Sequence, residues 1–195
     1  GAGLASSAAL EVATGFALQK LLGLALSGIE LARIAQEAEN GFVGVQCGIM
    51  DQIVSRLARS GHAILVDTRS MECRHVPLNL KGVKILITNS SVPRALAETE
   101  YNQRRLECEK CVSLLNTKKP GRSLRDFTAA DLRDSMGLIP EATRKKCLHV
   151  VEENQRVLEA EAALKKGDLA AFGKLMNRSH ESLRDQYEVS CPELD

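Results

Sequence analysis

The sequence has 195 residues, of which 44% are hydrophobic, and its formal net charge at neutral pH is +1. A charge this close to zero argues against a nucleic-acid-binding protein or a polybasic membrane-surface protein, and apolar stretches of only a turn or two are far shorter than the ~20 residues of a membrane-spanning helix. A chain of this length can bury a core, either as one large domain or as two small ones.

The beginning of the chain is predicted to be helical. Residues 4–22 are rich in Ala and Leu and indicate a long, mostly buried helix. Ser27 is expected to cap a second helix that runs to Glu39. Glycines punctuate the following segment, and a short helix is predicted from about residue 50 to residue 59.

A β-rich stretch comes next. The segment HAILVDT (62–68) alternates as a strand does, and ECRHVPL (72–78) is predicted to be its hairpin partner. The segment GVKILITNS (82–90) predicts a third strand that ends in polar residues.

From residue 95 onward the pattern is almost wholly helical, with a solvated loop at 116–123. The expected helices cover residues 95–115, 128–136, 141–166 and 169–185. The change from mixed α/β to mostly helical sequence near residue 82 predicts two domains, 1–81 and 82–195.

The sequence contains six cysteines but lacks the other signs of a secreted protein, so we expect reduced thiols and a cytoplasmic location. Cys108 and Cys111 form a lone CxxC one turn apart on a predicted helix. No second CxxC and no paired histidines complete a zinc site. We interpret these two thiols as structural or incidental, and not as a metal or redox site.

The opening segment GAGLASSAAL is the most informative about function. Gly1 and Gly3 let the backbone turn tightly and approach a ligand closely. Ser6 and Ser7 stand where the first helix begins, and serine is a favoured N-cap residue. The free N–H groups of a helix N-terminus bind anions, and two hydroxyls there could also reach a metal ion on a polyphosphate. The alternative is an ordinary capped helix behind a glycine turn; the spacing matches neither a P-loop nor a Rossmann fingerprint.

Three further residues are candidates for chemistry. Asp51 begins a short helix beside glycines and could accept a proton from a substrate hydroxyl, or it could simply complement the helix dipole. Glu39 ends a helix, where a carboxylate is slightly disfavoured, which suggests a local need such as a metal ion. Tyr101 follows a predicted strand, where ligands gather in α/β folds, although a packed tyrosine is the simpler interpretation. The four histidines show no metal-ligand spacing.

Taken together, these segments resemble the GHMP small-molecule kinases, and within them the members that phosphorylate galactose. GLASSAALEVAT resembles the phosphate-loop motif GLSSSAALEVAT, which is shared across the family. CGIMDQ, EYNQRR and YEVSCPELD resemble segments of the galactose-specific members, and the resemblance runs nearly end to end. It implies an α/β (α+β) fold of the GHMP type, with a partial ribosomal-S5-like N-terminal domain and the start of a helical and sheet-containing C-terminal domain.

The resemblance also implies an activity and roles for individual residues. The expected reaction transfers the γ-phosphate of ATP to the 1-hydroxyl of α-D-galactose with Mg²⁺, as in the Leloir pathway of galactose catabolism. Asp51 would be the catalytic base, and Ser7 and Glu39 would hold Mg²⁺. The remaining expected contacts are Gly1, Gly3, Leu4, Ser6, Ser7 and Ala8 with the phosphates of ATP, and Gly48, Asp51 and Tyr101 with the sugar.

The chain also departs from the family pattern. Ala5 replaces the first serine of the usual run, and Pro93 stands where a basic residue is often found. The family's first and third motifs are missing, and the chain lacks an initiator Met, so we expect a central fragment that is inactive by itself. Two alternatives stay open: a catalytically dead paralogue that senses galactose and ATP, and an N-acetylgalactosamine kinase or other sugar 1-kinase. Neither nucleic acid nor membrane is an expected partner.

Overall fold

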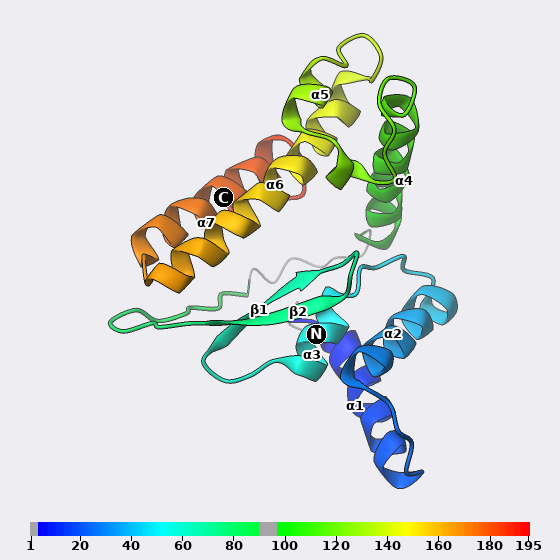
Figure 1. Ribbon diagram of the computed structural model, residues 1–195, viewed down its shortest axis with the longest axis vertical. Helices are drawn as coiled ribbons and strands as arrows, with labels where there is room; N and C mark the ends of the chain where they lie inside the picture. Colours follow the sequence, from blue (N-terminus) through cyan, green and yellow to red (C-terminus); the bar gives the residue numbers. More distant parts are fainter. Residues whose placement is uncertain (1–3, 90–96) are drawn as a thin grey trace. The chain divides into compact units, whose positions relative to one another are not determined.

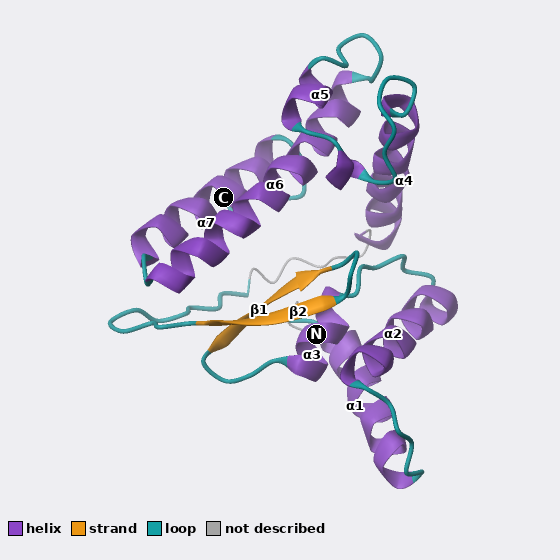
Figure 2. Cartoon of the chain, in the orientation of Figure 1, coloured by secondary structure: helices purple, strands orange, loops and turns teal. Residues whose placement is uncertain are grey.

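The computed structural model describes residues 4–89 and 97–195 (Figures 1 and 2). The chain divides into two compact units, Gly1–Asn89 and Ser90–Asp195. The first unit combines helices with a β-hairpin and the second is helical, so the α/β class is confirmed. No helix within these residues is both long and apolar enough to cross a membrane.

The first unit has three α-helices, a π-helical turn and one hairpin (Figure 1). Their bounds are α1 Ser6–Leu21, α2 Gly28–Ala38, η1 Glu39–Val43, α3 Met50–Leu57, β1 His62–Asp67 and β2 Glu72–Pro77. The strands are antiparallel, with His62 opposite Pro77 and Asp67 opposite Glu72. The Asp67 side chain closes the turn because its Oδ1 accepts from the backbone N–H of Arg69 (2.9 Å) and Ser70 (3.1 Å).

Helix α2 begins and packs as its sequence predicts. Ser27 Oγ accepts from Glu30 N–H (3.2 Å) and Ser27 N–H donates to Glu30 Oε2 (2.7 Å), which is a complete capping box. The apolar face of α2 buries Leu31, which lies so close to α1 that a Cβ at Gly15 would stand 2.7 Å from Leu31 Cδ1. Glycine at this position therefore lets α1 and α2 approach each other.

Two predictions about burial and strand formation in this unit are wrong. The first concerns α1, which was expected to be mostly buried. Only Ala8 and Val12 are buried, while Leu10, Leu18 and Leu21 are 69%, 50% and 80% exposed. Helix propensity is local and is satisfied here, but burial requires a partner surface, and the described residues cover only one side of α1.

The second wrong prediction is the strand over 82–90. Residues 82–89 form no strand, and Ile85, Leu86 and Ile87 are 69%, 88% and 66% exposed. A strand exists only where a neighbour accepts and donates its backbone hydrogen bonds. Within the described residues this segment has no such neighbour, because β1 and β2 pair only with each other.

The second unit is built from helices whose limits agree closely with the sequence-based prediction. They are α4 Ala97–Leu115, the 3₁₀ turn η2 Leu124–Asp126, α5 Ala129–Arg133, α6 Glu141–Lys166 and α7 Leu169–Asp185. Helix α6 packs against α4, α5 and α7 (Figure 1). Leu115, Leu124, Phe127, Leu132 and Ile139 form the buried core together with two cysteines.

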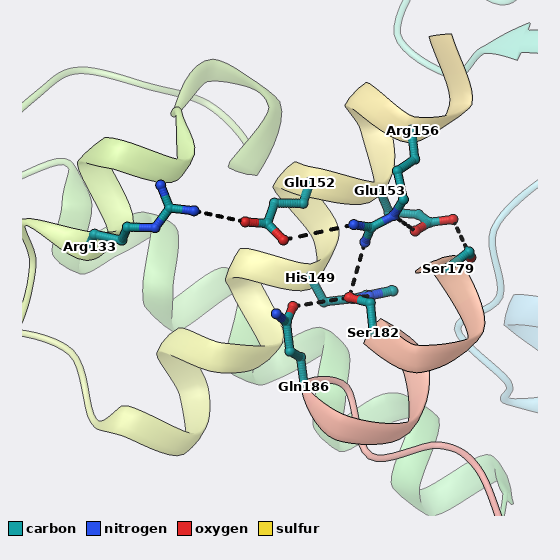
Figure 3. Close-up of polar contacts among 8 residues, drawn as sticks. All are labelled: Arg133, His149, Glu152, Glu153, Arg156, Ser179, Ser182 and Gln186. Atoms are coloured by element: carbon teal, nitrogen blue, oxygen red, sulfur yellow. Dashed lines mark hydrogen bonds and ion pairs between the residues drawn. The ribbon is translucent and has the colours of Figure 1, made fainter. Parts of the chain in front are cut away.

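A buried polar network joins α6 to α7 (Figure 3). Arg156 Nη2 donates to Ser182 Oγ (3.0 Å), and the Ser182 hydroxyl donates to Gln186 Oε1 (3.0 Å). His149 Nδ1 lies 2.8 Å from Ser182 Oγ. Because the Ser182 proton is already donated to Gln186, His149 acts as the donor in this contact. Burial lowers the pKa of His149, which favours the neutral ring. Ser182 is therefore a hub of hydrogen bonds that fixes two helices, and not an activated nucleophile.

Candidate functional site

Among the described residues, which begin at Leu4, nothing caps the N-terminus of α1. Its N-cap residue is Ala5, in the left-handed conformation (φ 55°), and no described side chain caps the helix. The prediction that serine caps this helix is therefore wrong: Ser6 and Ser7 are its first two residues, and both are exposed. The first N–H groups of α1 and two hydroxyls thus remain available at one end, which suits a phosphate group.

A pair of carboxylates lies on the same unit. Glu11 follows Ser7 by four residues and so shares its face of α1. The Glu11 side chain lies close to those of Glu39 and Gln52, and Gln52 Nε2 donates to Glu39 Oε2 (3.1 Å). Burial, followed by the charge of Glu39, raises the pKa of Glu11. A cation beside these two carboxylates would offset their mutual repulsion.

The backbone between η1 and α3 is held against this pair. Asn40 Oδ1 accepts from Cys47 N–H (3.0 Å), and Gln36 Nε2 donates to the Cys47 carbonyl (3.0 Å). The Cys47 sulfur lies 3.9 Å from Gln52 Nε2, and the pKa of this thiol is raised by burial and then by Glu39. Gly48 is the next residue, so these contacts fix where its backbone lies relative to the carboxylates.

Asp51 lies in the first turn of α3, and its side chain is half-buried. Its carboxylate makes no hydrogen bond or ion pair with another described residue. The helix itself is anchored by Ile53, which is fully buried, and by Gln52, which is 1% exposed. Asp51 is therefore positioned by its neighbours and is itself left uncommitted, as a proton acceptor must be.

The structure brings together only part of the predicted site. Glu39 is placed with Glu11 and Gln52, two residues that the sequence analysis missed. The spacing of Glu11 from Ser7 and the position of Gln52 beside Asp51 are the signals that could have identified them. Ala8 is buried and Leu4 is exposed. Gly1, Gly3 and the side chain of Tyr101 lie outside the described residues.

The site has the donors that Mg²⁺ prefers. Glu11 Oε2 and Gln52 Oε1 are buried and lack a hydrogen-bond partner among the described residues. In the same part of the chain, no group of three or more His, Cys, Asp and Glu side chains is arranged to hold a metal ion. Mg²⁺ usually binds one or two carboxylates and takes its other ligands from water and substrate phosphates. Two carboxylates near an open helix N-terminus fit that pattern.

Replacing Glu11 by Gln should stabilise the metal-free protein at neutral pH, because it removes one of two neighbouring like charges that are partly shielded from water. We expect the melting temperature to rise by about 2–4 °C, and we expect added MgCl₂ to stabilise the wild type more than Glu11→Gln. Differential scanning calorimetry with and without Mg²⁺ measures both effects. Glu37→Gln, on the exposed face of α2, is the matched control and should change neither. Equal responses of wild type and Glu11→Gln to Mg²⁺ would exclude Glu11 from the metal site.

Comparison with known proteins gives matches to one family of kinases. Residues 1–59 match the family model "GHMP kinases N terminal domain". Over its whole length the chain is 50% identical to a galactokinase of Roseiflexus sp. (strain RS-1) and 49% identical to one of Thermotoga maritima, covering 50% and 53% of those proteins. The crystal structure of Lactococcus lactis galactokinase complexed with galactose matches 97% of this chain with a TM-score of 0.93 and 36% identity. That match covers 49% of the Lactococcus chain. The chain thus spans about half the length of the relatives it matches.

Proposed function

We propose that the protein is a kinase of the GHMP family, whose N-terminal domain model matches residues 1–59, and that it transfers the γ-phosphate of ATP to the 1-hydroxyl of α-D-galactose. The observation that carries the proposal is the Glu11–Glu39 carboxylate pair on the unit that also holds the open N-terminus of α1. Phosphoryl transfer needs a phosphate cradle, a cation and a positioned hydroxyl whose proton has somewhere to go. This unit offers candidate residues for each requirement.

The phosphates of ATP would lie at the start of α1. The N–H groups of its first turn point toward the open end, and the helix dipole favours negative charge there. The proposed contacts are Gly1, Gly3, Leu4, Ser6, Ser7 and Ala8. Ala8 is buried, so it would contribute its backbone N–H and the packing that fixes the first turn.

Mg²⁺ would be held by Ser7 and Glu39, with Glu11 as an added candidate. Bound there, the ion would neutralise negative charge on the phosphates. Gln52 keeps one oxygen of Glu39 fixed by its hydrogen bond (3.1 Å), so the other oxygen has a defined direction. The hydrogen bonds of Gln52 therefore orient a proposed ligand before substrate arrives.

The sugar would bind beside α3. Asp51 would accept the proton of the 1-hydroxyl, or stabilise the charge that develops on it, and Gly48 and Tyr101 would contact the sugar. The proposal places the protein in the cytoplasm, which the six unpaired cysteines support.

A coupled ADP-release assay on the full-length protein with a panel of sugars tests this function. Galactose should be phosphorylated at carbon 1, as ³¹P and ¹H NMR of the product would show. Preference for N-acetylgalactosamine or another sugar would show that the protein is a 1-kinase for that sugar and not for galactose. Tight binding of galactose and ATP without product would identify it as a sensor, and the absence of both would overturn the proposal.

Ser7 and Ser6 form a matched pair for the phosphate site. Ser7→Ala should raise the KM for MgATP by about 10- to 100-fold, the effect of losing a charge-assisted contact, and should leave galactose binding nearly unchanged. Ser6→Ala should have a smaller effect, and it should cost little stability because Ser6 does not cap α1. Steady-state kinetics with each substrate varied in turn measures this. A larger MgATP defect in Ser6→Ala would reverse the assignment.

A further inference from the structure

Three thiols converge where α4 packs against α6. Cys108 and Cys111 lie one turn apart on α4, and Cys147 lies on α6. Cys111 and Cys147 are both 0% exposed within one buried cluster, and Cys108 packs against that cluster from its partly exposed edge. The preceding residues confirm the proximity, because Lys146 Nζ lies 2.9 Å from Glu107 Oε2.

Cys147 is the common partner of the other two thiols. Its thiol lies close to the thiols of both Cys108 and Cys111. Interaction with Cys147 lowers the pKa of Cys108, with Lys146 nearby acting in the same direction, and it lowers the pKa of Cys111 as well. The same two interactions raise the pKa of Cys147. The arrangement therefore makes Cys108 and Cys111 the better nucleophiles and Cys147 the thiol poised to react with either of them.

We propose that Cys108 and Cys147 are a redox-modification site that forms an intramolecular disulfide between α4 and α6 when the protein meets a hydroperoxide such as H₂O₂. The proposal rests on the contact of the two sulfurs and on the difference in their burial. Cys108 is the only one of the three thiols with exposed surface, so an oxidant from solvent reaches it first.

The chemistry balances in two steps. The Cys108 thiolate attacks one peroxide oxygen, the O–O bond breaks, and the departing hydroxide takes up a proton to become water, which leaves Cys108 as a sulfenic acid. Cys147 then loses its proton and attacks the Cys108 sulfur; the S–S bond forms, the S–O bond breaks, and the oxygen leaves as water. Two thiols have lost two electrons, and the peroxide has been reduced to two molecules of water.

The sequence provides a direct readout of the pairing. Trypsin cuts after Arg105, Lys110 and Lys146, so each thiol of the cluster falls in a different peptide. These peptides are LECEK (106–110), CVSLLNTK (111–118) and CLHVVEENQR (147–156). After treatment of the folded, full-length protein with a small excess of H₂O₂ and alkylation of the remaining thiols, non-reducing mass spectrometry should find 106–110 linked to 147–156. Dithiothreitol should release the two peptides.

Matched variants separate this site from the other cysteines. Cys73→Ser, in the first unit, should leave the cross-link unchanged. Cys147→Ser should abolish it and leave Cys108 as a sulfenic acid that dimedone labels. Should Cys147→Ser fold poorly, the wild-type map still decides the question, with a urea-unfolded sample as its control, in which the links should spread over all six cysteines.

Three results would overturn the proposal. The first is an untouched Cys108 under conditions that oxidise Cys47 or Cys191. The second is Cys108 oxidised to sulfinic acid with no link to Cys147. The third is a link from Cys147 to peptide 111–118 alone, which would assign the site to the two buried thiols.

Discussion

Replacing Asp51 by Asn should lower the kcat for galactose phosphorylation by about 10²-fold or more, while ATP binding changes little. The substitution keeps the size of the side chain and its place in the first turn of α3 but removes the group that takes up a proton. Because no described residue pairs with Asp51, its loss should not disturb the packing of Gln52 and Ile53. The expected loss is therefore confined to the chemical step.

Rapid-quench kinetics and ATP titration on the full-length protein measure the two parts of this prediction separately. Ser55→Ala, an exposed position of the same helix, is the control for nonspecific effects on α3. Near-normal kcat in Asp51→Asn would remove Asp51 from the mechanism. A large loss of ATP affinity in Asp51→Asn would instead assign Asp51 to the nucleotide-binding site.

The 195-residue chain by itself should show no measurable galactose phosphorylation and should associate in solution. Phosphoryl transfer depends on positioning and preorganised charge, so part of a pocket does not give a proportional part of the rate. The described residues also expose apolar side chains, among them those on the outer side of α1 and in the segment 83–87. Contiguous exposed apolar surface of this kind promotes association.

Light scattering, binding of a hydrophobic dye and the kinase assay on the purified chain test this expectation. Leu86→Lys, at an 88% exposed position, should reduce association without changing the helical signal. Leu132→Lys, at a fully buried position, should instead unfold the second unit. A soluble, cooperatively folding monomer that phosphorylates galactose would show that the 195 residues are an enzyme in their own right.

Most helices of the second unit could be predicted from sequence almost to the residue, although α5, expected over 128–136, is only Ala129–Arg133. Helices α6 and α7 have the limits expected from their patterns, because the signals that begin and end them are local: Asp168 accepts from Ala171 N–H (2.9 Å), and Gly167 adopts the left-handed conformation that ends α6. The β1–β2 hairpin was predictable for the same reason, since its strands and its turn are contiguous in the chain.

Predictions that needed a distant partner failed. Residues 82–90 have the composition of a strand, but a strand also requires a neighbour to pair with, and composition does not supply one. The expected burial of α1 failed likewise, and Ser6 and Ser7 proved to lie inside the first turn because the chain places Ala5 at the N-cap. Helix propensity could identify α1, but it did not locate the residue at which the helix begins.

The residues of the candidate site likewise fall into two groups, those that the sequence singled out and those that only the tertiary structure revealed. Sequence alone singled out Ser7, Glu39 and Asp51 as candidates: Ser7 and Asp51 from the short motifs in which they stand, and Glu39 from its place at the end of a predicted helix. Glu11, Gln52 and Cys147 emerged only from the tertiary structure, because their importance lies in the side chains that the fold brings beside them. In the sequence, Glu11 is only a carboxylate on a helix, and its importance comes from the nearby Glu39. Cys147 is only one thiol of α6, and its importance comes from Cys108 and Cys111 of α4. Residue type and spacing determine what a side chain can do, whereas the pKa and the partner of that side chain depend on atoms far away in the sequence.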